Sequence, residues 1–541
     1  MKPKRVHSHP KKKATSGMRL AFLKQTIESD HPLADPKAAR AALDALPQRN
    51  PVAAVETLTD YLDSVREAEG LTAVRVFEII ESVDHAAKAV IRRLTVEYLE
   101  ADGEQRAHAT RIAHVVADFW NHVARGYRML LEMHETGDPT ARDLQPLLGV
   151  IAARGVRAFT LHLKWRLFRY SPVDPALWGC LARVFAIADQ NAIADTPVIV
   201  YPGAWGQSTV RREMLKSLML AISATDTLPK MHIEIVERLC AQYSEFFTLQ
   251  EHVAPGVHFQ FDTHDDLAPA RATGESRSKG LRFFGPGGAA PHLKKLAQDI
   301  RTSGAIPSTV NLGGAYPVPT VIEVLEHLAR YWAPTPPSRK ERRRASEEVV
   351  EVVHGFKDIL GAVDADEFGW DFDVTKYEDW TLSNESSVGF GATVPVGESE
   401  WVTLGNLVGL KYVDEGASWS VGVVRRISQT PGDLRSVGIE LYSRGVIRVL
   451  LYALLSDGTH HPDPERSVDA LLLPSSADNS LGKLTVRVAV RQGSYDARAS
   501  YGLMLYGMDY LLVPKGLVDS TEDYAVVEYK LLQRSHDDED Y

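Results

Sequence analysis

The sequence predicts a multidomain α+β protein, with a helical N-terminal region followed by antiparallel β domains. The chain has 541 residues, which is too many for one hydrophobic core. Apolar residues recur at helical spacing through most of residues 31–332. Beyond a proline-rich segment at residues 333–338, apolar residues instead form short runs rich in β-branched and aromatic side chains.

Residues 31–332 are expected to form a mainly α-helical domain. The segment AAVETLTDYLDSVREAEG places Val55, Leu58, Leu62 and Val65 on one helical face, and Gly70 is a stop signal. The same spacing recurs over residues 71–103 and in three later segments. A helical bundle is expected; an array of helical repeats remains possible, although no fixed period is visible. Residues 258–261 interrupt the pattern and favour a strand.

The segment APTPPS (333–338) marks the main domain boundary. Its three prolines cannot continue a helix and favour an extended connector. Beyond it, runs such as WSVGVVRRIS and SVGIELYS are separated by Gly, Asp, Pro or Ser, a spacing typical of antiparallel barrels or sandwiches. Two small β domains are expected, at residues 339–450 and 451–534.

Composition and charge exclude several classes of protein. The formal net charge of −10 argues against a general nucleic-acid binder, so no direct nucleic-acid partner is expected. No apolar run is long enough to span a membrane, and two cysteines, Cys180 and Cys240, suit the reducing cytoplasm. The basic residues 1–30 and the acidic residues 535–541 are expected to be solvated, disordered tails.

A basic cluster follows the proline-rich connector. Residues 339–344 carry five positive charges, interrupted only by Glu341. The planar donors of arginine can bind phosphate oxygens or the edge of guanine in a bidentate way. A cluster of this kind is more often a solvated surface. The cluster therefore indicates a ligand only in combination with a second feature.

The second feature is the stretch LSNESSVGFGA, residues 382–392. It places Asn384, Ser386 and Gly389 at positions 1, 3 and 6 of a turn between two strand-like runs. Asn, Ser and Gly are also the residues that any hairpin turn prefers. An ordinary turn and one half of a binding site therefore both remain open.

Together, the two segments resemble the PilZ domain family of receptors for the bacterial second messenger cyclic di-GMP. The family pairs an RxxxR segment with a later [DN]xSxxG turn. Here these motifs read Arg339-Lys-Glu-Arg-Arg343 and Asn384-Glu-Ser386-Ser-Val-Gly389. The downstream strands GVVRR and VGIEL also fit the family. The resemblance covers roughly residues 336–450, so a PilZ-like barrel is expected behind the large helical region.

The resemblance implies roles for the residues in these motifs. Arg339 and Arg343 would clamp guanine edges and phosphates of cyclic di-GMP, with Arg342 and Arg344 as possible extra contacts. Asn384 and Ser386 would hydrogen-bond from the barrel surface, and Gly389 would allow a tight turn. The flexible connector would let the arginines fold over the ligand. No cofactor, metal or catalytic residue is implied.

Two features of the basic segment leave its geometry open. About 40 residues separate Arg343 from Asn384, and the intervening segment 357–380 is acidic and aromatic, as an inserted helix or loop. The register is also open, because Lys340 and Arg344 form an alternative pair with the same spacing.

Three functions remain in consideration. The first is a cytoplasmic cyclic-di-GMP effector whose helical domain binds a protein partner. The second is a PilZ-like structural or adaptor protein that binds no nucleotide. The third, an enzyme, would use a metal held by His258, Asp262, His264, Asp265 and Asp266, but their spacing matches no metal motif. The sequence contains no GxSxG, HExxH or CxxC motif, so no enzyme is expected.

Overall fold

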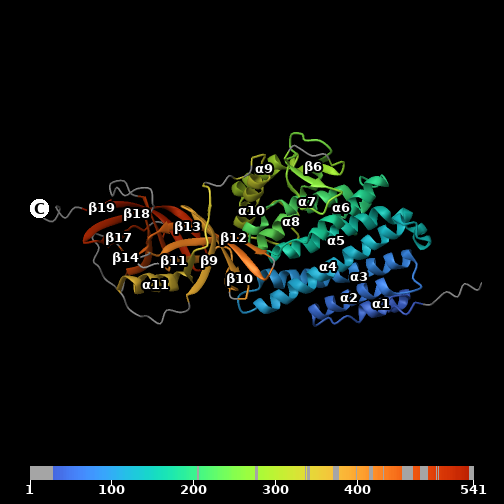
Figure 1. Cartoon of the computed structure of the whole chain (residues 1–541), viewed down its shortest axis with the longest axis horizontal. Helices are drawn as coiled ribbons and strands as arrows, with labels where there is room; N and C mark the ends of the chain where they lie inside the picture. The colour runs from blue at the N-terminus through green and yellow to red at the C-terminus, as the bar shows by residue number, and fades with distance from the viewer. Residues whose placement is uncertain are drawn as a thin grey trace, which may run out of the picture.

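The fold was analysed in a computed structural model of the chain. It describes residues 29–534 except 204–205, 274–277, 336, 338–340, 369–376, 398, 414–417, 431, 454–466, 475–484, 495 and 497–498. The helical region occupies one end of an elongated molecule, the first barrel lies in the middle and the second barrel at the other end (Figure 1). The predicted tails at 1–30 and 535–541 lie outside the described residues, apart from residues 29 and 30.

The helical region is built from ten α-helices and three short 3-10 helices within the described residues. They are α1 (Pro36–Asp44), α2 (Pro51–Glu67), α3 (Ala73–Glu100), α4 (Arg106–Glu135), η1 (Pro139–Leu147), α5 (Leu148–Phe168), α6 (Pro175–Gln190), α7 (Val210–Ala221), η2 (Thr225–Thr227), α8 (Lys230–Gln242), η3 (Ser244–Phe246), α9 (Ala289–Ser303) and α10 (Val318–Tyr331). Several begin at capping side chains, such as Asp35, Asn50 and Thr72, which accept hydrogen bonds from first-turn backbone N–H groups.

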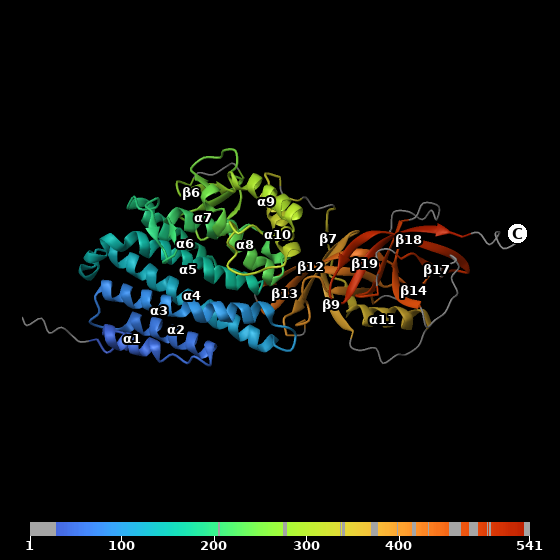
Figure 2. The same cartoon turned by 180° about the vertical axis from the view of Figure 1, so that it is seen from behind.

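The helices pack around one continuous hydrophobic core. Helix α5 is apolar on most of its surface and lies between α4 and the later helices α6, α7 and α8, as the view from behind also shows (Figure 2). A helix that is apolar on more than one face is typically buried between neighbours. Phe159 and Trp165 of α5 are among its buried side chains.

Two small sheets complete the helical region. One contains β1 (Val198–Ile199) and β2 (Gln207–Ser208). The other has the order β3-β6-β4-β5, with β3 (Thr248–Gln250), β4 (Phe259–Asp262), β5 (Ala270–Arg271) and β6 (Leu281–Gly285). Strand β4 confirms the strand predicted near residues 258–261.

The first barrel closes through six antiparallel strands in the order β10-β13-β12-β11-β8-β9, because β9 also pairs with β10. Strand β7 adds to the outside edge of β9. The strands are β7 (Arg344–Ala345), β8 (Val349–His354), β9 (Glu378–Ser386), β10 (Gly389–Pro395), β11 (Leu407–Tyr412), β12 (Ser420–Thr430) and β13 (Leu434–Arg444). Trp380 and Phe390 are buried inside it.

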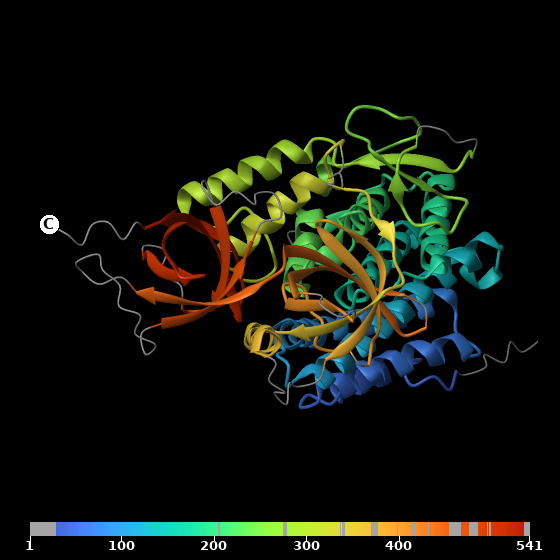
Figure 3. The same cartoon turned by 60° about the vertical axis from the view of Figure 1, so that its left-hand side comes forward.

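The second barrel has the closed order β14-β15-β16-β19-β18-β17. Its strands are β14 (Ile447–Ala453), β15 (Ser467–Leu473), β16 (Thr485–Arg491), β17 (Tyr501–Leu505), β18 (Met508–Ser520) and β19 (Tyr524–Gln533). The predicted boundary between residues 450 and 451 falls within β14, all of which belongs to this barrel. Figure 3 shows the two barrels from their side of the molecule.

The acidic insert begins with helix α11 (Phe356–Phe368), which joins the two barrels. Phe356 and Ile359 of α11 lie in one hydrophobic cluster with Val421 of the first barrel and Leu471 of the second. The helix therefore has an apolar face that both barrels cover. Residues 369–376 of the insert lie outside the described residues, and its last residues, 378–380, form the start of β9.

The predicted architecture, a multidomain α+β protein with a helical region followed by β-barrels, is confirmed. Within the described residues, no helix combines the length and the apolar character that a membrane crossing requires.

Candidate functional site

The candidate site lies at the hairpin between β9 and β10 of the first barrel. Ser386 and Gly389 face each other as the last pair of this hairpin, and Ser387 and Val388 form its tip. The hydroxyl of Ser386 donates to the carbonyl oxygen of Gly389 at 3.3 Å. The predicted turn is therefore a two-residue hairpin connection, and its polar side chains stand at the rim of the barrel.

The arginine-rich segment reaches this hairpin. Arg344 and Ala345 form β7, which pairs with Glu385 and Asn384 of β9. This pairing places Arg343 beside the hairpin, where its Nη1 donates to Oδ1 of Asn384 at 2.8 Å. The two segments, some forty residues apart in sequence, thus meet despite the acidic insert between them. Arg339 and Lys340 lie outside the described residues.

A pocket of about 250 Å³ opens beside this contact. Arg343, Ser386 and Gly389 line it, together with Val388, Glu341, Arg425, Arg426, Gly438, Ile439 and Glu440. Asn384 does not line the pocket but fixes the guanidinium of Arg343, which does. Arg342 and Arg344 are exposed and lie outside its lining.

Two glycines make room for these contacts. A Cβ on Gly389 would stand 2.4 Å from the carbonyl oxygen of Ile439 on β13, so only glycine allows this approach. Gly389 has no left-handed φ, so the close approach of β13, rather than turn geometry, accounts for the glycine. A Cβ on Gly391 would stand 2.7 Å from Nδ2 of Asn384.

Arg425 and Arg426 supply the opposite wall of the pocket, and the prediction did not include them. A β-bulge in β12 makes Arg425 an extra residue, because Val424 pairs with Ile439 and Arg426 with Gly438. Both arginines are exposed although they are adjacent in a strand. Two arginines in succession after four apolar residues were the sequence signal for this bulge.

Each of these arginines also contacts a neighbouring domain. Nε of Arg426 lies 2.5 Å from Oδ2 of Asp226 in η2 of the helical region. Nη2 of Arg425 donates to Oδ2 of Asp519 in the second barrel at 2.7 Å, and its Nε donates to Glu440 at 3.0 Å. The pocket wall is therefore tied to both neighbours of the first barrel.

Glu341 places a negative charge in the same pocket. Its Oε2 accepts hydrogen bonds from the hydroxyl of Ser387 at 2.6 Å and from its backbone N–H at 3.2 Å. Three arginines and two glutamates, Glu341 and Glu440, thus line the pocket. The excess of positive charge favours the binding of an anion, whereas the negative charge of Glu341 disfavours it.

The helical region carries a match with a known family. Residues 37–255 match the family model described as "Cyclic-di-GMP receptor FimW, N-terminal domain". The comparisons with curated proteins and with solved structures gave no match. The matched range ends before the barrel, so the resemblance to the PilZ family over residues 336–450 stays a prediction.

The histidine and carboxylate cluster near residue 262 has a different geometry from a metal centre. Oδ1 of Asp262 accepts a hydrogen bond from the backbone N–H of His264 at 2.9 Å. Among the described residues, no group of three or more His, Cys, Asp or Glu side chains is arranged to hold a metal ion.

Proposed function

We propose that this protein is a non-catalytic cyclic-di-GMP receptor that binds its ligand in the pocket beside the β9–β10 hairpin. The observation that carries the proposal is the contact between Arg343 and Asn384, which joins the two predicted halves of the site at one pocket. The family matched by residues 37–255 is named for a cyclic-di-GMP receptor, which supports the same ligand. In this proposal the first barrel is a PilZ-like domain.

The chemistry of the pocket fits a cyclic dinucleotide. Guanidinium groups of Arg343, Arg425 and Arg426 can bind phosphate oxygens and guanine edges through charge-assisted hydrogen bonds. Ser386 adds a small hydroxyl at the rim. The arginine-rich segment, Arg339 included, is proposed to add further contacts to the ligand, as the resemblance implies.

We further propose that ligand binding is transmitted to the helical region, which binds a protein partner. The guanidinium of Arg426 contacts Asp226 and also lines the pocket, so a phosphate bound there would compete with Asp226 for this cation. A ligand that engages Arg426 would therefore weaken its contact with η2. The neighbouring hydrogen bonds from Gln429 to the Tyr170 carbonyl (2.7 Å) and from Ser171 to Gln429 (2.8 Å) complete this interface.

The proposed location is the cytoplasm, where the second messenger would be available. Both cysteines are free thiols, which is typical of a reducing compartment, and burial raises the pKa of the Cys240 thiol. The matched family and the resemblance to the PilZ family both support cyclic di-GMP as this messenger.

Calorimetric titration of the full-length protein with cyclic di-GMP tests the proposal. Saturable binding is expected, and Ser386→Ala should weaken it several-fold because one rim hydrogen bond is lost. Ser303→Ala is the matched control, because Ser303 is exposed at the end of α9 and lies outside the pocket lining. Absence of saturable binding in the wild type would leave the alternative, an adaptor whose barrel binds no nucleotide.

Hydrogen–deuterium exchange tests the coupling to the helical region. With cyclic di-GMP bound, backbone amides of η2 and of the adjoining Leu228 should exchange faster, because the contact between Asp226 and Arg426 loosens. Unchanged exchange in η2 despite saturating ligand would contradict the coupling while leaving binding itself intact.

A further inference from the structure

A second pocket, of about 560 Å³, lies within the helical region and is unrelated to the barrel site. It is bounded by α3, α4, α5, α8 and the loop at residues 313–316. Its lining includes Lys88, Arg92, Trp120, Trp165, Arg238 and Tyr316. Its volume falls in the range of about 300–1,000 Å³ typical of small-molecule sites.

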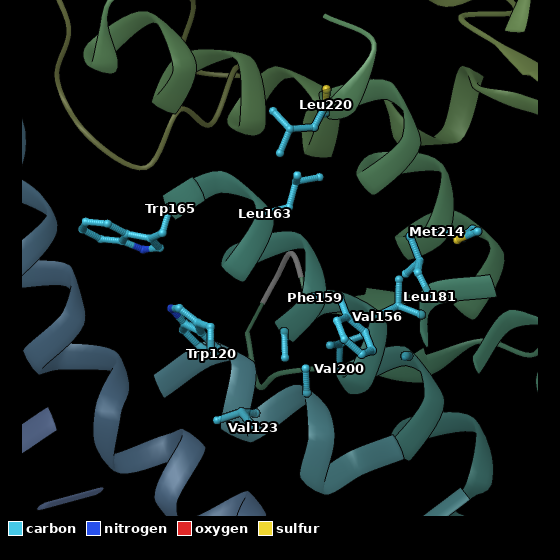
Figure 4. Packing of buried hydrophobic residues seen from close by; sticks show 14 of the residues in the cluster. Trp120, Val123, Val156, Phe159, Leu163, Trp165, Leu181, Val200, Met214 and Leu220 are labelled. Atoms are coloured by element: carbon cyan, nitrogen blue, oxygen red, sulfur yellow. The ribbon is translucent and has the colours of Figure 1, made fainter. Parts of the chain in front are cut away.

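One wall of this pocket is aromatic and carries an unsatisfied donor. Trp120 of α4 and Trp165 of α5 lie on the same side of the helical core (Figure 4). Trp120 is only 5% exposed, and its indole Nε1 has no hydrogen-bond partner among the described residues. A buried donor without a partner is costly, so an acceptor group of a ligand that reaches this indole N–H would be favoured.

The cations deep in the pocket are already paired. Nζ of Lys164 lies 2.8 Å from Oε2 of Glu234, and Nη2 of Arg238 lies 2.8 Å from the other oxygen of the same carboxylate. Arg157 is paired with Glu213 at 2.7 Å. These buried pairs leave little positive charge to attract an anion at the base of the pocket.

The two cations of α3 that line the pocket differ from these pairs in their contacts. Lys88 and Arg92 are one helical turn apart and both line the pocket. Nζ of Lys88 lies 3.4 Å from the ring centroid of Tyr201, and Lys88 forms no ion pair with a carboxylate within the described part of the chain. Arg92 makes one long hydrogen bond, 3.3 Å, to the carbonyl oxygen of Gly313. Two cations therefore remain available for an anionic group.

We propose that this pocket binds a nucleoside monophosphate, with the phosphate at Lys88 and Arg92 and the base against the aromatic wall. The edge of a nucleobase requires both a hydrogen-bond donor and an acceptor, and the lining of the pocket has both. The indole N–H of Trp120 can donate to a ring nitrogen or carbonyl, and the carboxylate of Glu100 on the lining can accept from an exocyclic amino group. An anion without a ring would leave the aromatic wall unfilled.

Calorimetric titrations of the full-length protein with GMP, AMP and guanosine test this site. At least one of the two nucleotides is expected to bind saturably, and guanosine should bind at least roughly tenfold more weakly than GMP if GMP is that nucleotide. For AMP the same comparison uses adenosine. Failure of both nucleotides to bind at millimolar concentration, or equal affinity for the nucleoside, overturns the proposal.

Variants on α3 locate the binding. Arg92→Ala should weaken nucleotide binding roughly tenfold, because one charge-assisted contact with the phosphate is lost. Arg93→Ala is the matched control, because Arg93 is exposed outside the pocket and pairs with Glu97 at 3.0 Å. Unchanged binding in Arg92→Ala overturns the proposal, and so does loss of binding in Arg343→Ala, which would assign the nucleotide to the barrel.

Discussion

At the scale of single residues, Glu341 is the side chain that most restricts the barrel pocket. Its carboxylate lies on the lining shared with Arg343 and is held by two hydrogen bonds from Ser387. In the proposed receptor, an anionic ligand has to approach this negative charge or displace it. Glu341 would therefore lower the affinity of the pocket for an anionic ligand.

Glu341→Gln is expected to bind cyclic di-GMP several-fold more tightly than the wild type. The substitution removes a like charge from the pocket and keeps the shape of the side chain. Calorimetry measures the change, with Glu347→Gln as the control, because Glu347 is exposed and outside the lining. Weaker binding by the variant would show that Glu341 contributes a contact to the ligand rather than opposing it.

Gly389 is a second single residue on which the barrel depends, because β13 packs closely against it. Gly389→Ala is expected to lower the free energy of unfolding by roughly 1–3 kcal/mol, because the new Cβ would overlap the Ile439 carbonyl oxygen. Gly397→Ala is the control, since no atom lies within 4 Å of a Cβ built there. Urea unfolding followed by the tryptophan fluorescence of the barrel compares them; equal stability of the two variants would contradict the account.

At the scale of secondary-structure elements, α5, α7 and α8 are joined by a buried ionic network. Glu213 of α7 is fully buried between Arg157 of α5, at 2.7 Å, and Lys216, at 2.6 Å. Burial raises the pKa of Glu213, but the two cations outweigh burial and hold this pKa at about 2. The carboxylate is therefore ionised throughout the range of pH in which the protein would work.

Removing the charge of Glu213 should lower the free energy of unfolding far more than removing a surface charge. Glu213→Gln is expected to destabilise the protein by roughly 3–5 kcal/mol, because buried cations lose their counter-ion. Glu323→Gln, which removes a carboxylate exposed on α10 that contacts His232, should cost less than about 1 kcal/mol. Urea unfolding monitored by helical circular dichroism measures both, and similar losses would refute a structural role for the network.

The elements also show what could be predicted from the sequence. The change of apolar spacing near residue 333 correctly separated helices from barrels, because burial of one face imposes the period of each element. Arg425 and Arg426 were missed although they follow each other in the sequence, because side chains alternate along a regular strand and only the bulge exposes both. Glu341 was missed because its contact depends on where β7 adds to the barrel.

At the scale of the whole molecule, half-buried histidines couple stability to pH. Burial lowers the pKa of both His162 and His327, although each contacts a backbone carbonyl oxygen at 2.7 Å. In the unfolded chain these side chains take up protons near pH 6.5, whereas in the folded protein they resist protonation. Acid therefore favours the unfolded state.

The melting temperature is accordingly expected to fall as the pH is lowered from 7.5 to 5.5. This window lies above the range in which Glu213 titrates, and it spans the range in which His162 and His327 take up protons in the unfolded chain. His327→Gln should show a smaller decrease than the wild type in differential scanning calorimetry. A melting temperature that stays constant or rises over this range would contradict the assignment.

In the whole molecule, both the helical region and the second barrel contact the lining of the barrel pocket. Arg426 connects the pocket to the helical region and Arg425 connects it to the second barrel. In the proposed receptor, the affinity for the ligand and the contact between the domains would be linked through the same side chains. Such linkage is reciprocal, so weakening the domain contact should strengthen ligand binding.

The most direct test is the calorimetric affinity for cyclic di-GMP of the full-length wild type, Arg343→Ala and Asp226→Asn, measured side by side. The account predicts that Arg343→Ala binds at least roughly tenfold more weakly, because a charge-assisted contact is lost. It predicts that Asp226→Asn binds more tightly, because Arg426 is released to the pocket. Equal affinities of all three proteins, or no binding by any, would contradict it.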